Sequence, residues 1–270
     1  MDKLVVLSLN ITTMPELPDL QVFARNLNKL FKGKTLEKVE VPHSKKLNVS
    51  IEQLKDALEG AKLHDVRRVG KELHFAFNNK HVLGQHLMLH GEFRLFDGEN
   101  KHKSTIIELH FKGEQGLAIT DFQGAATPTL DPEEKDAPDA LDVEKEYLMG
   151  KLAKTKKPVK TVLMDQKVLR GIGNAYADEI LWDAKISPFS ISNKLPEEVV
   201  SKLIKSIKEV LEDAEKQIIK SNPDLISGEV RDFLKVHLPR QKQTATGATI
   251  YQKELNARKT YYTDEQELFE

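Results

Sequence analysis

The sequence predicts an α+β protein of two domains: an N-terminal β-sandwich with a leading helix, and a C-terminal helical domain that ends in a β-hairpin. Three observations predict this fold. Short strand-like runs fill the first half, apolar residues at helical spacing fill the second half, and an acidic segment containing prolines separates the two halves. With 270 residues, of which 39% are hydrophobic, the chain is long enough for a core in each domain.

The first half begins with one amphipathic helix and continues as strands. Between Pro15 and Lys32 apolar residues recur near helical spacing, and Gly33 suits the end of a helix. Turn signals such as Asn78-Asn79 separate several of the runs that follow. The expected strands are Thr35–Val41, Leu63–Val69, Glu72–Phe77, Val82–Leu89, Glu92–Phe96, Thr105–Phe111 and Leu117–Thr120. This pattern predicts a sandwich domain over residues 14–130.

The second half changes from strand to helical periodicity. Asp131 to Leu148 carries eight acidic residues and two lysines, so we expect an exposed acidic linker over residues 131–150. Helices are expected at Lys157–Met164, Ala175–Asp183 and Pro196–Lys220, within a helical domain over residues 151–235. In the last segment, residues 236–270, Thr249–Leu255 and Arg258–Tyr262 flank Asn256-Ala257 and predict a terminal hairpin.

Charge and composition limit the classes of partner. The net charge of −1 argues against nucleic acid, but the stretch from Lys151 to Asn174 holds seven basic residues and one acid, which favours local phosphate binding. The absence of cysteine excludes disulfides and thiolate zinc sites, and we expect no metal and no cofactor. No apolar run is long enough for a membrane span, so a soluble intracellular protein without a membrane partner is expected.

Two segments are candidates for chemistry. Residues 164–181, Met-Asp-Gln-Lys-Val-Leu-Arg-Gly-Ile-Gly-Asn-Ala-Tyr-Ala-Asp-Glu-Ile-Leu, follow most of the basic stretch. Gly171 and Gly173 would let the backbone approach a phosphate, and Asn174 could cap the next helix and reach a nucleic-acid backbone. The other segment is Met14-Pro15-Glu16-Leu17-Pro18-Asp19. In isolation, the first is typical of a helix-capping loop and the second of a helix start.

Together these segments resemble the formamidopyrimidine-DNA glycosylase / endonuclease VIII family of DNA-repair enzymes, and the resemblance spans nearly everything from Met14 to Gln266. It implies a helix–two-turn–helix motif at residues 164–181. It also implies that Pro15 attacks the sugar as an N-terminal amine and that Glu16 acts as general acid and base. A free α-amine has a pKa of roughly 8, against roughly 10.4 for lysine, so more of it is nucleophilic near neutral pH.

The thirteen residues that precede Met14 depart from the family pattern. An internal proline nitrogen is a tertiary amide and has no lone pair to offer. We therefore expect translation to start at Met14, so that removal of methionine exposes Pro15.

The resemblance assigns further residues to DNA. Lys71 and Arg258 would complete the catalytic set by holding phosphates, and Leu89 would fill the space left by a flipped base. Additional DNA contacts are expected at His102, Lys154, Lys156, Gly173 and Asn174. The terminal hairpin resembles the finger of zincless members, because the four thiolate positions are occupied by Gln243, Thr246, Thr263 and Gln266.

Two departures bear on specificity. Residues 120–126 stand where the family has Asp-Pro-Arg-Arg-Phe-Gly, so the arginine that reads the orphan base and the phenylalanine wedge lack counterparts. The long lesion-capping loop of 8-oxoguanine-specific members is also missing near Asp232-Phe233-Leu234. The sequence therefore does not assign 8-oxoguanine as the substrate.

The expected function is a base-excision repair glycosylase with AP lyase activity, monomeric and cytoplasmic in a bacterium, that removes oxidised bases from damaged double-stranded DNA through a proline Schiff base. One alternative is a non-catalytic damaged-DNA or abasic-site binding protein on the same fold. The other is an RNA-binding protein that uses the helix–two-turn–helix alone. The preferred lesion, the opposite base and the type of elimination stay open at this stage.

Overall fold

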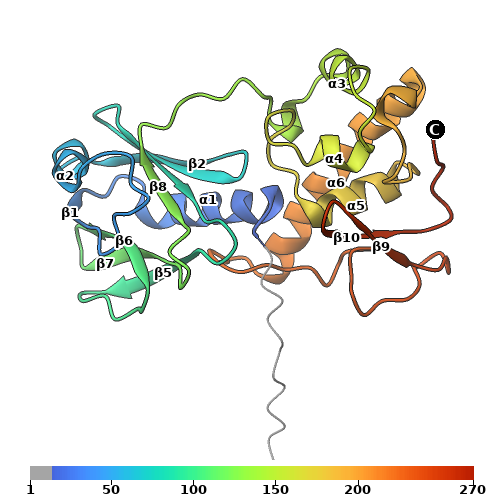
Figure 1. Ribbon diagram of the computed structural model, residues 1–270. Helices are drawn as coiled ribbons and strands as arrows, with labels where there is room; N and C mark the ends of the chain where they lie inside the picture. The colour runs from blue at the N-terminus through green and yellow to red at the C-terminus, as the bar shows by residue number, and fades with distance from the viewer. Residues whose placement is uncertain (1–13) are drawn as a thin grey trace, which may run out of the picture.

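The computed structural model describes residues 14–270, and the expectation about residues 1–13 lies outside the described residues. The chain forms two domains that lie side by side, with the sandwich at one end and the helices and terminal hairpin at the other (Figure 1). No helix among residues 14–270 is both long and apolar enough to span a membrane.

The N-terminal domain is a sandwich of two antiparallel four-stranded sheets. One sheet has the order β1-β6-β7-β5 and the other β2-β3-β4-β8. Buried apolar side chains between the sheets form one core, in which Phe93 packs edge-on against Phe23. The strands are β1 (Leu36–Glu40), β2 (Leu63–Val69), β3 (Glu72–Phe77), β4 (Val82–His86), β5 (Glu92–Asp97), β6 (Thr105–Phe111), β7 (Gln115–Thr120) and β8 (Thr127–Leu130).

Two short elements of this domain were not predicted. Helix α2 (Ile51–Leu58) buries only Leu54 and Leu58, so its apolar stripe is too short to stand out. Its start does carry a signal, because Ser50 and Gln53 form a reciprocal capping box. Strand β8 has four residues and contains Pro128, and it lies at the edge of its sheet, where a missing amide donor is tolerated.

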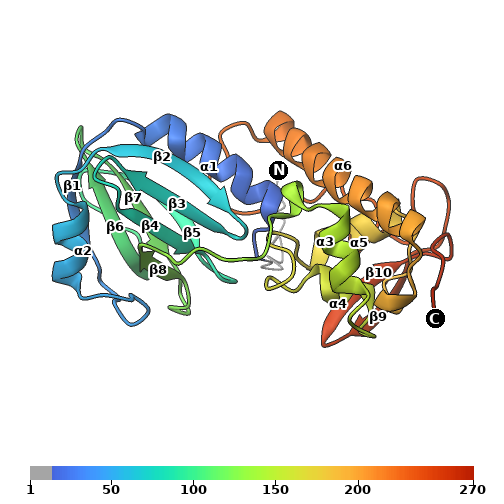
Figure 2. The ribbon, with the colours of Figure 1, turned by 90° about the horizontal axis from the view of Figure 1, so that it is seen from above.

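Helix α1 (Leu17–Phe31) connects the two domains. Its first residue, Leu17, packs in the C-terminal core, whereas Leu20, Phe23 and Phe31 pack in the N-terminal core. The helix starts at a capping box, in which the Glu16 N–H donates to Asp19 Oδ2 at 2.9 Å. Seen from above, α1 runs over the sandwich towards the C-terminal domain, where it packs against α6 (Figure 2). One rigid element is therefore shared by both cores.

The C-terminal domain packs its helices around the long helix α6. They are the 3₁₀ turn η1 (Ala140–Asp142), α3 (Lys145–Leu152), α4 (Val159–Leu163), α5 (Asn174–Asp183), the 3₁₀ turn η2 (Ser192–Lys194) and α6 (Glu197–Ser221). Helix α3 begins inside the segment predicted as an exposed linker and ends two residues beyond it. Its Leu148 and Leu152 are buried in the C-terminal core, and Glu146 is the one acidic residue of the linker that lies on this helix. The predicted linker at 131–150 is too long for this reason.

The chain ends in the predicted hairpin, formed by β9 (Tyr251–Leu255) and β10 (Arg258–Tyr262). Arg258 pairs with Leu255, and the two connecting residues, Asn256 and Ala257, both have positive φ angles of 50° and 59°. Two left-handed residues in a two-residue loop are typical of a type I′ turn, whose twist matches that of the strands.

Polar contacts hold this hairpin on the helical domain. The Lys160 ammonium is fully buried 2.7 Å from Asp178 Oδ1 and donates to Thr260 Oγ1 at 2.8 Å. Asp178 Oδ2 accepts the Tyr261 N–H at 3.0 Å and lies 2.7 Å from His237 Nδ1. Burial lowers the pKa of Lys160, and the adjacent Asp178 opposes this effect. Lys160 is therefore a structural residue, although the sequence analysis counted it in the basic stretch that favours phosphate binding.

The positions that correspond to zinc ligands also form polar contacts with protein groups. Gln266 Oε1 accepts the Thr263 N–H at 2.8 Å, and Gln266 Nε2 donates to the Ile186 carbonyl at 2.8 Å. Thr246 donates to Glu265 Oε1 at 3.1 Å, and Gln243 bridges to Thr249 in the backbone. Hydrogen bonds thus tie together the parts of the finger that metal ligation would otherwise join.

We expect Lys160→Met to destabilise the protein by about 3–5 kcal/mol, because the buried Asp178 carboxylate then lacks its ammonium partner at Oδ1. Chemical denaturation monitored by fluorescence measures this change. Lys205→Met, on the exposed surface of α6, is the matched control. The double variant Lys160→Met, Asp178→Asn should lose less than the sum of the two single variants. Additive losses would contradict the assignment of the pair as the anchor.

Candidate active site

The centre of the site is the Glu16 carboxylate, which joins the two domains. Glu16 is 5% exposed and lies immediately before α1. Its Oε2 accepts the N–H groups of Gly173 at 2.6 Å and Tyr176 at 3.3 Å, and its Oε1 accepts that of Ala175 at 2.9 Å. These are amides at the amino end of α5, where helix N–H groups lack partners and favour negative charge. Glu16 thus caps a helix of the other domain.

The sequence analysis expected Asn174 to provide this cap. In the structure Gly173 is the residue before the helix, and Asn174 is the first helical residue. The Asn174 side-chain amide donates to the Lys259 carbonyl at 3.0 Å, so it contacts the hairpin. Its Oδ1 is buried without a hydrogen-bond partner among the described residues. Asn174 therefore links α5 to β10 and does not cap α5.

Gly171 and Gly173 are required by close approach between the domains. A Cβ on Gly173 would lie 2.3 Å from Glu16 Cδ and 2.5 Å from Lys71 Nζ, and one on Gly171 would lie 2.6 Å from Leu17 Cδ1. Gly171 also has a φ of +107°, which disfavours any other residue. The space beside both glycines, which the sequence analysis attributed to phosphate approach, is filled by side chains of the N-terminal domain. It follows that Glu16 and Lys71 meet at Gly173.

The Lys71 ammonium is the second component of the site. Lys71 lies in the turn between β2 and β3. Burial lowers the pKa of Lys71, Glu16 opposes this effect, and Arg258 and Arg231 reinforce it. A larger fraction of Lys71 is thus neutral near physiological pH than for an exposed lysine.

A buried ion pair holds the turn that carries Lys71. Arg68 contacts Asp139 through both terminal nitrogens, at 2.5 and 2.9 Å, and donates to the Gly70 carbonyl at 3.1 Å. Asp139 also accepts the Gly70 N–H at 3.2 Å. Because Asp139 belongs to the segment between the domains, this segment fixes the position of Lys71.

A second arginine–aspartate ion pair, with two hydrogen bonds, fixes the start of α1. Arg231 donates to both oxygens of Asp19 at 2.7 and 2.6 Å, and its guanidinium lies 5.1 Å from the centre of the Tyr176 ring. Asp19 in turn accepts the Glu16 N–H. Arg231 therefore positions the segment that carries Pro15, which is itself buried.

Glu229 lies next to this ion pair, with its Oε2 3.6 Å from Arg231 Nη2. Burial raises the pKa of Glu229 to about 7, with Arg231 opposing the increase and Asp19 and Glu16 adding to it. The sequence analysis assigned no role to Glu229 or Arg231. Both lie in the segment after α6, where only the absence of a long loop was noted.

Arg258 begins β10 and is exposed. Its positive charge acts on both Lys71 and Lys160, so it lies within electrostatic reach of the site. The structure thus brings together Pro15, Glu16, Lys71, Gly173, Asn174 and Arg258 around the junction of the domains.

Exposed apolar side chains gather on two loops of the sandwich. Leu89, in the loop after β4, is 44% exposed, and Met88 beside it is 36% exposed. Phe122, in the loop between β7 and β8, is 69% exposed, and its ring lies 4.5 Å from that of His90. Phe122 thus provides an exposed aromatic ring next to the loop that carries Leu89, although the sequence analysis found no counterpart for the family's phenylalanine.

Three of the expected DNA contacts lie outside this group. His102 is exposed in the loop between β5 and β6, and its Nε2 contacts the Leu95 carbonyl at 3.0 Å. Lys154 and Lys156 are exposed after α3. None of the three contacts Glu16 or Lys71.

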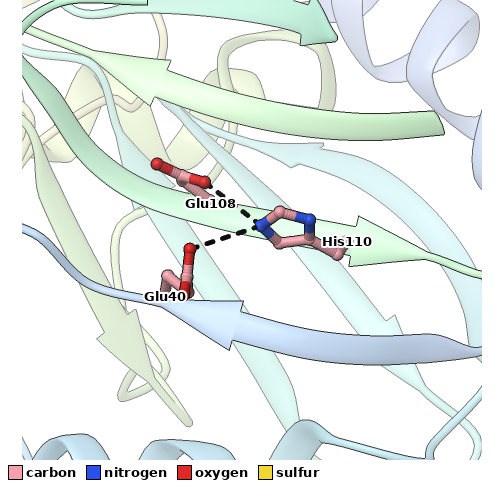
Figure 3. A group of neighbouring side chains, drawn as sticks. All are labelled: Glu40, Glu108 and His110. Carbon is pink, nitrogen blue, oxygen red and sulfur yellow. Dashed lines mark hydrogen bonds and ion pairs between the residues drawn. The ribbon is translucent and has the colours of Figure 1, made fainter. Parts of the chain in front are cut away.

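One group of side chains in the sandwich has ligand types that suit a metal. Glu40 on β1 and Glu108 and His110 on β6 converge, with His110 Nε2 3.1 Å from Glu108 Oε2 and 3.7 Å from Glu40 Oε2 (Figure 3). Lys38 contacts Glu40 at 2.5 Å, and Asn100 donates to Glu108 at 2.8 Å. Protein cations and donors already satisfy these carboxylates. Strands β1 and β6 also lie at the end of the sandwich far from α5 (Figure 1).

Comparison with known proteins agrees with this architecture. Residues 14–127 match the formamidopyrimidine-DNA glycosylase N-terminal domain, and residues 135–224 match the formamidopyrimidine-DNA glycosylase H2TH domain. The formamidopyrimidine-DNA glycosylase of Lactobacillus helveticus (strain DPC 4571) is 32% identical over 213 residues, covering 74% of this chain and 77% of the relative. That of Bacillus subtilis (strain 168) is 33% identical, covering 74% and 78%.

Solved structures extend the similarity to nearly the whole chain. A complex between the Lactococcus lactis Fpg and DNA containing an abasic site superposes with a TM-score of 0.84 at 27% identity, covering 93% of this chain and 99% of that one. A complex of the wild-type Lactococcus lactis Fpg with DNA containing an oxidized pyrimidine gives the same values. Fold and site together define a two-domain protein of the helix–two-turn–helix DNA-repair class. The chain belongs to the formamidopyrimidine-DNA glycosylase / endonuclease VIII family.

We expect the difference in the free energy of unfolding between the wild type and the Glu229→Gln variant to depend on pH. The folded protein holds the Glu229 proton more tightly than the unfolded chain does, because the pKa rises from 4.5 to about 7. Stability is therefore lost as the pH rises between these two values, by up to about 3 kcal/mol, and the loss is constant above about pH 7. Denaturation of both proteins between about pH 4.5 and pH 8 measures this loss, and parallel stability curves would contradict the pKa shift of Glu229.

Proposed function

We propose that this protein is a DNA glycosylase with AP lyase activity, which removes oxidised bases from duplex DNA during base-excision repair. The observation that carries the proposal is that the side chains of Glu16 and Lys71 meet at Gly173. Glu16 directly follows Pro15 in the chain. Family membership supports the reaction class, and relatives bound to abasic-site DNA support the partner. We further propose that it acts as a monomer in the bacterial cytoplasm.

Pro15 is the proposed nucleophile, in a mature chain that begins at this residue. The match to the family's N-terminal domain starts at residue 14, which supports Met14 as the start. The proline nitrogen forms a bond to the sugar C1′ while the bond from C1′ to the base breaks, and the base leaves with the bonding pair and a proton. Opening of the sugar at O4′ gives a charged iminium. Loss of a C2′ proton then expels the 3′ phosphate.

Glu16 and Lys71 are the proposed proton-transfer and phosphate-binding groups. Glu16 would accept the N–H proton that Pro15 loses on bonding to C1′, deliver it to O4′ and later accept the C2′ proton, since its carboxylate is held rigidly beside Pro15. Lys71 would hold the phosphate of the damaged nucleotide, and Arg258 would approach the same phosphate from the hairpin.

The remaining DNA contacts follow from the same placement. Asn174 would bind backbone phosphate through its unpartnered Oδ1 and a water, and His102, Lys154 and Lys156 would contact phosphates farther along the duplex. Leu89, together with Phe122, would fill the space left by the flipped nucleotide, because an apolar group restores stacking that flipping removes.

The decisive experiment is borohydride trapping on duplex DNA that contains an abasic site. A chain beginning at Pro15 should give a covalent adduct, because its amine forms a reducible iminium. The 270-residue chain should give none, because Pro15 is then an amide. An adduct of equal yield with the 270-residue chain would refute Pro15 as nucleophile. Tight binding by both chains, with no adduct from either, would favour the non-catalytic damaged-DNA binding protein.

We expect Arg258→Ala to weaken binding to abasic-site DNA about tenfold, because a charge-assisted contact to phosphate is lost. The slope of log affinity against log salt concentration should fall by about 1. Fluorescence anisotropy at several salt concentrations measures both changes. Lys205→Ala, which removes an exposed charge of α6, is the control. If both variants behave alike, Arg258 makes no phosphate contact.

A further inference from the structure

The loop after β4, residues 87–91, is closed tightly around its exposed residue Leu89. Leu87 is buried in the sandwich core, and its carbonyl accepts the Gly91 N–H at 2.8 Å. A Cβ on Gly91 would lie 2.2 Å from that carbonyl oxygen, so the closure requires glycine. Both ends of the loop are therefore fixed, and Leu89 lies exposed between them.

One hydrogen bond holds the residue immediately before Leu89. Met88 has a φ angle of +56°, in the left-handed region that side chains other than glycine disfavour. Its N–H donates to Nδ1 of His86, the last residue of β4, at 2.9 Å. The imidazole thus binds the backbone two residues on, as an asparagine side chain does in an Asx turn. This contact stabilises the unfavourable conformation of Met88.

The hydrogen bond requires a neutral imidazole at His86. Both ring nitrogens of a protonated histidine are donors, so an imidazolium cannot accept the Met88 N–H. Burial lowers the pKa of His86, Glu72 on β3 acts in the opposite direction, and Lys71 and Lys135 lower it further. Because the ordinary pKa of histidine is about 6.5, His86 is mostly neutral at physiological pH.

The sheet connects this loop to the proposed catalytic lysine. Glu72 pairs with His86 across β3 and β4, and Lys71 immediately precedes Glu72 in the chain. The Glu72 carboxylate is held in turn by Lys135, whose Nζ lies 2.5 Å from Oε1. One pair of strands therefore positions both the turn that carries Lys71 and the start of the loop that carries Leu89.

We propose that His86 is a positioning residue, which directs Leu89 towards the space left by a flipped nucleotide by accepting the Met88 N–H. This inference rests on the proposed glycosylase function. It assigns His86 to extrusion of the damaged base and gives it no part in bond breaking at the sugar. Extrusion has to overcome base stacking, and a side chain that is already held in place need not be ordered on the DNA.

The test compares two reactions of a chain that begins at Pro15. One is release of base from a duplex with a single formamidopyrimidine, and the other is cleavage of the same duplex with a preformed abasic site. The ratio of the two single-turnover rates reports extrusion of the base, because an abasic sugar has no base to unstack. His86→Leu should lower this ratio about fivefold, as expected for loss of one hydrogen bond.

Two amide variants distinguish a lost acceptor from a disturbed core. In His86→Asn the side-chain oxygen stands close to the place of Nδ1 and can accept the Met88 N–H, so the ratio should stay within about twofold of the wild type. In His86→Gln the amide stands at the place of Nε2, out of reach of that N–H. We therefore expect His86→Gln to lower the ratio as much as His86→Leu does.

The background Leu89→Ala tests whether His86 acts through the exposed leucine. There His86→Leu should cause no further fall in the ratio, because the side chain that it positions has been removed. His64→Leu, an exposed change on β2, is the matched control and should follow the wild type. Thermal unfolding establishes that each variant is folded.

The outcomes separate this inference from the proposed function. Failure of the unsubstituted chain to cleave the abasic duplex would refute the lyase function itself. With cleavage intact, a wild-type ratio for His86→Leu and His86→Gln would refute the role of His86, as would a ratio for His86→Asn as low as theirs. A further fall on adding His86→Leu to Leu89→Ala would show that His86 does not act through Leu89, and would refute the inference as well.

Discussion

The structure depends on one carboxylate at the amino end of one helix. Glu16 belongs to the N-terminal domain, yet its oxygens satisfy three amides of α5 in the C-terminal domain. Other polar contacts support this junction: Asp19 accepts the Glu16 amide, Arg231 forks Asp19, and Asp139 holds the turn that carries Lys71. Because buried charges are stable only when paired, each link requires the next. The domains and the proposed catalytic groups are positioned by the same interactions.

The hairpin illustrates a second use of buried polar groups. A small β-hairpin has too little apolar surface to be stable alone. Here Lys160 donates to Thr260, and Asp178 accepts the backbone N–H of Tyr261. Gln266, at one of the positions that resemble zinc ligands, accepts from Thr263 and donates to Ile186. The cost of desolvating these groups is offset by their ion pair and by their hydrogen bonds to the hairpin. Arg258 can therefore be presented at a fixed place near the site.

Local signals in the sequence predicted much of this fold, whereas long-range pairing was beyond them. The apolar periodicity predicted helices α1 and α6 with nearly correct bounds. The Asn256-Ala257 turn predicted the hairpin in the same way. Helix α3 was assigned to the linker because the segment before it is rich in acidic residues and prolines, and only two leucines of the helix are buried. The charge count likewise included Lys160 in the basic stretch, since nothing nearby in the sequence indicates Asp178 as its partner. The cap on α5 and the burial of Glu229 depend on residues more than a hundred positions away.

Helix α1 has a mechanical consequence, because its first turn is anchored in one core and the rest in the other. A rotation of one domain away from the other would require α1 to bend or Leu17 to leave the C-terminal core. Either change loses buried apolar contacts and costs several kilocalories per mole of free energy. A duplex of DNA yields to bending at a comparable or lower expense, especially at a damaged step where stacking is already weak. The architecture therefore favours a stiff protein on which the DNA bends. The ease with which DNA deforms at a lesion then contributes to recognition of that lesion.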